Sequence, residues 1–178
     1  GQPYRNEQGK YPVIFLTFKD VKFDNWKDSL EAIRLVIRDE YMRHDEILSW
    51  DGLDVVEKDY LDRMQKGTLS NVEYTRALLN LSRMLEKYHN KKIVVLMDEY
   101  DTPIQQGYTE GYYEQITGFM RNLLSGAFKD NSNLSYGFLT GILRVAKESI
   151  FSGLNNLKVN SILEDRYSEY FGFTKDEI

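Results

Sequence analysis

Three carboxylates stand directly behind an apolar segment of the chain: Asp98, Glu99 and Asp101 follow residues 93–97, which are Ile, Val, Val, Leu and Met. Five apolar residues without a polar interruption predict a strand that is covered on both faces, as central strands of parallel sheets are. Open α/β sheets bind ligands outside the carboxyl ends of their strands. Adjacent carboxylates at such an end suit the binding of a magnesium ion and the orientation of a water molecule.

The three carboxylates are assigned different roles. Asp98 is the candidate magnesium ligand, because one strand-end carboxylate, nucleotide phosphates and several waters are a normal ligand set for this ion. Glu99 is the candidate catalytic residue, which would accept a proton from the attacking water or orient it. Asp101 is a further candidate metal ligand. For Asp98 and Glu99, the alternative is that they only cap the segment that follows.

Two more candidates lie at or just past a later strand, predicted over residues 136–140. They are Thr140 and Arg144. Because all strands of a parallel sheet open their carboxyl ends on the same edge, a hydroxyl and a guanidinium here suit contact with a γ-phosphate. Both are therefore candidate nucleotide-binding residues. The alternative is a strand-terminal hydrogen bond for Thr140 and a surface ion pair for Arg144.

Hydrophobic spacing predicts the elements that must position these residues. We expect strands at residues 13–18, 93–97, 136–140 and 157–163, and helices at 26–41, 56–64, 74–88, 111–128 and 147–151. Ser70 with Glu73, and Thr174 with Glu177, have the spacing of capping boxes that open helices. Residues 45–52 are expected to be a connection, and Pro103 and Gly107 to mark a loop. Strands that alternate with helices predict an α/β fold with a parallel sheet between helix layers.

Composition sets limits on the class of protein. The length of 178 residues suggests one domain, and the net charge of -5 gives no general case for binding nucleic acid or membranes. The chain has no cysteine, which excludes disulfides and thiolate chemistry. His44 and His89 are far apart in sequence and are expected to be solvated helix residues rather than zinc ligands. No segment has the length and apolarity of a membrane span, so a cytoplasmic location is the default expectation.

A nucleotide hydrolase also needs a glycine-rich loop that holds the phosphates, with the pattern G-x-x-x-x-G-K-[ST]. The sequence does not contain this pattern. Gly9 and Lys10 are the nearest fragment, but Tyr11 and a strand follow them instead of Ser or Thr and a helix. No G-x-S-x-G is present either, so serine-hydrolase chemistry has no support.

Four segments together resemble the predicted AAA-ATPase-like family of bacterial proteins, which are P-loop NTPases that often carry a C-terminal nuclease-like domain. The segments are YPVIFLTFKDVK, IVVLMDEYDTPI, FLTGILRVAKESIFSGLNN and YFGFTKDEI. The resemblance covers essentially the whole chain. It implies a three-layer, AAA- or STAND-like parallel sheet, with ATP and magnesium as cofactors. It also implies that Asp98 and Glu99 are the Walker B pair and that Thr140 or Arg144 lies in the sensor region.

The main departure from the family is the missing Walker A loop, which should precede Gly1. We therefore expect residues 1–178 to be an AAA-ATPase-like core fragment, incomplete at the N-terminus, cut at a helix start near Ile178 and inactive alone. In AAA-like sheets the Walker A strand lies beside the sensor strand. The expected order is thus the strands at 13–18, 93–97 and 136–140, then a vacant or borrowed position, then the 157–163 region.

Three functions from different classes remain open. The first is an ATPase whose cycle, in the longer parent protein, moves or regulates an attached domain. The second is a nucleotide-free scaffold that self-associates or binds a partner through a sheet edge or a tyrosine-rich surface. The third is a magnesium-dependent nuclease with Asp98, Glu99 and Asp101 as metal ligands.

Overall fold

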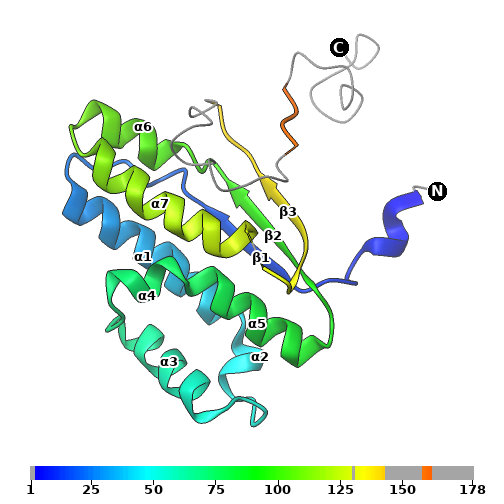
Figure 1. Cartoon of the computed structure of the whole chain (residues 1–178). Helices are drawn as coiled ribbons and strands as arrows, with labels where there is room; N and C mark the ends of the chain where they lie inside the picture. Colours follow the sequence, from blue (N-terminus) through cyan, green and yellow to red (C-terminus); the bar gives the residue numbers. More distant parts are fainter. Residues whose placement is uncertain (1–2, 130, 143–157, 162–178) are drawn as a thin grey trace.

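The computed structural model of the chain describes residues 3–129, 131–142 and 158–161 (Figure 1). A short 3-10 helix, η1 (Pro3–Glu7), precedes a fold in which strands and helices alternate. The elements that follow are β1 (Val13–Thr17), α1 (Trp26–Arg43), α2 (Asp45–Leu48), α3 (Val55–Lys66), α4 (Asn71–Thr75), α5 (Ala77–His89), β2 (Ile93–Asp98), α6 (Thr102–Thr109), α7 (Tyr113–Phe128) and β3 (Leu134–Leu139).

The three strands form one parallel sheet in the order β1-β2-β3. This is the order that the sequence predicted for them. The register aligns Thr17 of β1 with Asp98 of β2, and Met97 of β2 with Leu139 of β3. The strands therefore end together at one edge of the sheet, which is the edge that carries the candidate site.

One face of the sheet packs under the helices. The buried strand residues alternate with less buried ones, and Ile93, Val95 and Met97 of β2 are 0–1% exposed. Helices α1, α5 and α7 each contact a strand, and Figure 1 shows the helices gathered on one side of the sheet. The hydrophobic core of the described residues lies in this layer.

The other face of the sheet is apolar but less covered. Phe15 is 47% exposed, Tyr136 is 56% exposed and Phe138 is 55% exposed, and Val94 and Leu96 of β2 lie between them. We call this surface the open face. The sequence predicted cover on both faces of β2, but within the described residues a helix layer covers only one.

Several helix boundaries follow from local sequence. The Asn25 side chain accepts a hydrogen bond from the Asp28 N–H and caps α1. The Ser70–Glu73 capping box is present, as predicted, and opens α4. Gly67 ends α3 with a φ of 67°, a left-handed conformation that glycine adopts without a steric penalty.

Three local predictions were wrong. The segment with Pro103 and Gly107 is helix α6 and not a loop, because a proline near the start of a helix needs no N–H partner. The helix predicted over residues 74–88 is interrupted at Arg76, which separates α4 from α5. The expected connection at residues 45–52 contains the short helix α2.

His44 also differs from its prediction as a solvated residue, because it is only 5% exposed. It lies between α1 and α2, where its ring nitrogens are 3.2 Å from Glu40 Oε1 and 3.1 Å from Glu46 Oε1. The Nε2 atom of His89 lies 3.5 Å from the same Glu46 oxygen, and the His89 side chain is 35% exposed. The two histidines, remote in sequence, therefore meet at one carboxylate.

The fourth predicted strand, at residues 157–163, is described only from Lys158 to Ser161, and those four residues are not in a strand. The predicted helix at 147–151 and the capping box at Thr174 and Glu177 lie outside the described residues. In the described part of the chain, none of the helices combines the length and the apolar character that crossing a bilayer requires.

Candidate functional site

The candidate site is built around the carboxylate of Asp98, the last residue of β2. Neighbouring strands place a threonine on each side of it. The Thr140 hydroxyl donates a hydrogen bond to Asp98 Oδ1 at 2.5 Å, and the Thr17 hydroxyl lies 3.4 Å from Asp98 Oδ2. The predicted convergence of strand ends is therefore confirmed for Asp98 and Thr140.

Main-chain hydrogen bonds fix this arrangement beyond the ends of the strands. The Thr140 N–H donates to the Met97 carbonyl at 2.9 Å, and the Tyr100 N–H donates to the Thr140 carbonyl at 3.2 Å. On the other side, the Phe18 N–H donates to the Asp98 carbonyl at 3.1 Å. Because Thr140 is hydrogen-bonded through both main-chain groups, its hydroxyl is held beside Asp98.

Glu99 lies at the turn that leads from β2 into α6. Its φ of 50° is in the left-handed region, which non-glycine residues adopt only rarely. The Thr102 hydroxyl donates to Glu99 Oε2 at 3.1 Å, and the Thr102 N–H donates to the Glu99 carbonyl at 3.1 Å. The turn therefore separates the two adjacent carboxylates: Asp98 is hydrogen-bonded within the sheet, whereas Glu99 is hydrogen-bonded to the start of α6.

Asp101, the third predicted carboxylate, is 1% exposed. Its Oδ2 atom accepts hydrogen bonds from the Gln105 side chain at 2.7 Å and from the Ile142 N–H at 3.0 Å. These contacts join the first turn of α6 to the chain that leaves β3. Asp101 therefore holds the segment after Thr140 against α6.

Gly141 is placed directly against this buried carboxylate. A Cβ atom added at Gly141 would lie 2.5 Å from Asp101 Oδ1, which is too close for a side chain. Glycine is thus required here by a close approach of the main chain to Asp101. Arg144, the fifth predicted site residue, lies outside the described residues.

The site contains one residue that the sequence analysis did not single out. Thr17 is the polar residue within the apolar segment of residues 13–18, and its register with Asp98 explains its place there. Its signal in the sequence was this polar interruption near the end of a predicted strand. Thr102 and Gln105 were missed because their segment was predicted to be a loop.

The donor chemistry at Asp98 fits a hard cation. A carboxylate flanked by hydroxyl oxygens supplies the oxygen ligands that magnesium prefers, and both hydroxyls can rotate. Within the described residues, no group of three or more His, Cys, Asp or Glu side chains is arranged to share a metal ion. Asp98 is the carboxylate of β2 whose surroundings fit such an ion.

Comparisons with known proteins identify a family and one curated relative. A family model described as "Predicted AAA-ATPase" matches residues 2–151, a range that includes every candidate site residue. A curated protein of Azotobacter chroococcum mcd 1, "Uncharacterized protein in vnfD 5'region", is 34% identical over 99 residues. That match covers 55% of this chain but only 19% of the relative. No solved structure matches the chain.

Proposed function

The chain belongs to the predicted AAA-ATPase family, and from this premise we propose that its sheet edge is the magnesium- and water-handling part of an ATP-hydrolysing site. The observation that carries the proposal is the Asp98 carboxylate, held between the hydroxyls of Thr17 and Thr140 at the carboxyl ends of three parallel strands. This is the part of an open α/β sheet where ligands bind.

Each residue has a proposed task. Asp98 would hold magnesium, and Thr140 would face the terminal phosphate and keep the Asp98 carboxylate in place. Glu99 would orient the attacking water or accept its proton, and Arg144 would contact the γ-phosphate. Asp101 remains a proposed metal ligand. Its buried hydrogen bonds to Gln105 and Ile142 support a second task, which is to hold the segment after Thr140.

The phosphate-binding loop is the missing part of such a site. Because the sequence has no glycine-rich phosphate loop, we assign that task to a part of the protein outside these 178 residues. On this proposal the chain is a core fragment of a three-layer P-loop NTPase domain and is inactive by itself. The open face supports the three-layer architecture, since parallel sheets are normally covered on both faces.

The proposal is tested with ATP hydrolysis by the full-length protein and its Glu99→Gln variant. We expect at least about a 100-fold loss of hydrolysis rate, because a positioned general base contributes rate enhancements of about 10²–10⁴. Magnesium-ATP affinity should be retained in Glu99→Gln and reduced in Asp98→Asn. The matched control is Glu110→Gln, which changes an exposed glutamate at the end of α6 and should leave the rate unchanged.

A second candidate function is a nucleotide-free interaction scaffold, which the apolar open face favours. The same experiment separates the two functions. An ATPase is contradicted if the full-length protein neither binds nor hydrolyses magnesium-ATP, or if Glu99→Gln hydrolyses it at the wild-type rate. The scaffold would then be the better explanation of the fold.

A further inference from the structure

The outer edge of β1 is a feature that the proposed ATPase site does not use. Within the described residues, β1 pairs only with β2. The Val94 N–H bonds to the Pro12 carbonyl at 2.9 Å and the Phe18 N–H to the Asp98 carbonyl at 3.1 Å, so alternate residues of β1 face β2. The main-chain groups of Val13, Phe15 and Thr17 must therefore point away from the sheet.

Side chains of α1 occupy the first half of this outer edge. Glu40 Oε1 accepts the Phe15 N–H at 2.8 Å, and Arg43 Nη2 donates to the Val13 carbonyl at 2.6 Å. Arg43 and Glu40 also pair with each other at 2.6 Å. These two side chains supply the acceptor and the donor that a neighbouring strand would supply, so no added strand can pair here without displacing them.

Glu40 is well suited to this position. It is 5% exposed, and although burial opposes ionisation, hydrogen bonds with His44, Arg43 and the Phe15 N–H outweigh this effect. The pKa of Glu40 is therefore lowered, and the carboxylate stays ionised at neutral pH. The block on the first half of the edge is thus a stable part of the fold.

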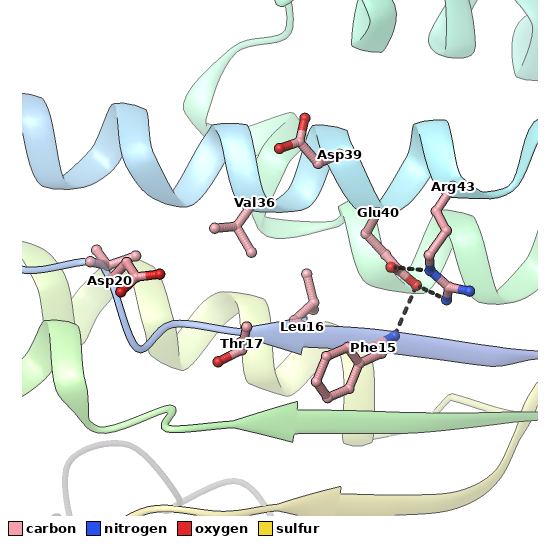
Figure 2. A pocket seen from close by; sticks show the side chains of 9 residues that line it. Phe15, Leu16, Thr17, Asp20, Val36, Asp39, Glu40 and Arg43 are labelled. Atoms are coloured by element: carbon pink, nitrogen blue, oxygen red, sulfur yellow. Dashed lines mark hydrogen bonds and ion pairs between the residues drawn. The ribbon is translucent and has the colours of Figure 1, made fainter.

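The second half of the edge is open. In the described part of the chain, neither the Phe15 carbonyl nor the Thr17 N–H has a hydrogen-bond partner. Phe15 and Thr17 both line a hollow of about 310 Å³ between β1 and α1 (Figure 2). In a parallel sheet, a residue of one strand forms two hydrogen bonds with the neighbouring strand. Its N–H donates to the carbonyl one position before the residue opposite it, and its carbonyl accepts from the N–H one position after that residue. A single residue opposite Leu16 would therefore satisfy both groups.

The side chains around the hollow indicate what kind of segment fits. Leu16, Val21 and Val36 supply apolar walls. The charged lining consists of three carboxylates, those of Asp20, Asp39 and Glu40, against the one guanidinium of Arg43. Because Glu40 and Arg43 neutralise each other, the exposed carboxylates of Asp20 and Asp39 set the charge of the hollow.

We propose that this hollow binds a short extended segment of a partner protein, which adds to β1 as a parallel strand. One apolar residue of the segment lies opposite Leu16 and packs against Val21 and Val36, and a lysine or arginine two residues away, on the same face of the strand, lies near Asp20 and Asp39. Pairing of two copies of this chain through the same edge is disfavoured, since it would bring four aspartates together in a chain of net charge -5.

The test uses two synthetic peptides, acetyl-Lys-Ser-Val-Ser-Lys-amide and acetyl-Glu-Ser-Val-Ser-Glu-amide, in which the valine and the charged residues share one face, titrated into the isotope-labelled full chain. The amide signals of Leu16 and Thr17 are followed by NMR, together with hydrogen exchange of the Thr17 amide. We expect the lysine peptide alone to shift these signals and to slow Thr17 exchange. Removing both charges with Asp20→Asn and Asp39→Asn should weaken binding about 5-fold, the effect of two surface ion pairs.

The matched control removes two other exposed carboxylates, with Asp51→Asn and Glu114→Gln, and should leave the affinity for the lysine peptide unchanged. Equal binding of both peptides, an equal loss of affinity in the control, or signal changes only at sites away from β1 would overturn the proposal. Thr17 protection that rises with protein concentration in the absence of peptide would overturn it in favour of a second copy.

Discussion

The hydroxyls around Asp98 are compatible with both roles considered for this carboxylate, a cap of the following segment and a proposed cation ligand. A hydroxyl both donates and accepts, so Thr140 can donate to Asp98 without a ligand and turn a lone pair outward when a cation or phosphate is present. The alternatives of cap and cation ligand are therefore compatible in one geometry. Substitutions of single residues separate the two roles: loss of a cap lowers stability, whereas loss of a cation ligand changes only ligand binding.

Asp101 is the carboxylate for which we expect the largest effect on stability. Asp101→Ala should lower the free energy of unfolding by about 2–3 kcal/mol, because it leaves the Gln105 side chain and the Ile142 N–H without a charged acceptor. Urea denaturation measures this loss. Asp51→Ala removes an exposed aspartate and should change stability by no more than about 0.5 kcal/mol. If Asp101→Ala were as stable as the wild type, a structural role for Asp101 would be ruled out.

The lowered pKa of Glu73 predicts how acid changes the stability of the fold. Hydrogen bonds from the Ser70 main chain and hydroxyl, with further support from Arg63, lower the pKa of Glu73 from 4.5 to about 2. Because this pKa is lower in the folded state, ionised Glu73 stabilises the fold above pH 4.5, and the contribution is lost as the pH falls toward 2. The difference in unfolding free energy between wild type and Glu73→Gln should therefore shrink over this range.

Urea denaturation at a series of pH values measures that difference. Glu114→Gln, at an exposed position on α7, is the control and should follow the wild type at every pH. A difference between wild type and Glu73→Gln that stayed constant from neutral pH to pH 2 would mean that the capping box does not depend on the charge of Glu73.

At the scale of elements, the contact of β3 with α7 depends on a glycine, Gly137. A Cβ atom at Gly137 would lie 2.6 Å from two ring atoms of Phe128. We expect Gly137→Ala to lower stability by about 1–2 kcal/mol, because the ring must move away from β3. Gly118→Ala in α7 is the control: its Cβ meets nothing within 4 Å, and it should raise stability by up to about 1 kcal/mol. A stabilising Gly137→Ala would show that α7 does not constrain β3.

Some of the elements could be predicted from the sequence alone, and others could not. The hydrophobic period was sufficient for β1, β2 and α1, because their apolar patterns are local signals. The meeting of Asp98 with Thr140 was predicted because parallel strands share an edge. By contrast, α6 was missed because Pro103 and Gly107 are turn residues in isolation. Here Pro103 starts a helix, and Gly107 lets that helix approach Ile116 of α7.

Contacts between residues remote in sequence could not be read from the pattern. His44 contacts its sequence neighbours Glu40 and Glu46, but the Glu40 carboxylate also accepts the Phe15 N–H of β1, a contact that the helical pattern does not reveal. The role of Thr17 beside Asp98 depends on the register between β1 and β2, which is fixed only when the sheet forms. In both cases the missing information was three-dimensional register.

At the scale of the whole molecule, the two faces of the sheet differ in how far their side chains are buried. The helix-covered side holds the core, whereas the open face presents Phe15, Tyr136 and Phe138, each about half exposed. An apolar sheet face that no helix layer covers within the described residues retains an unfavourable free energy of hydration, which a second layer would remove. The three-layer proposal therefore predicts that these residues matter differently in the isolated chain and in the full-length protein.

The double substitution Tyr136→Ser and Phe138→Ser tests this at the open face. In the 178-residue chain it should reduce the binding of a hydrophobic dye and change stability by less than about 1 kcal/mol, because these exposed rings contribute little to the core. In the full-length protein it should lower stability by about 3–6 kcal/mol, since each of the two buried aromatic rings then contributes about 1.5–3 kcal/mol. Tyr108→Ser, at a position 77% exposed on α6, should leave both properties unchanged. Equal effects of the double substitution in both proteins would contradict a second layer, because they would mean that nothing beyond this chain covers the sheet.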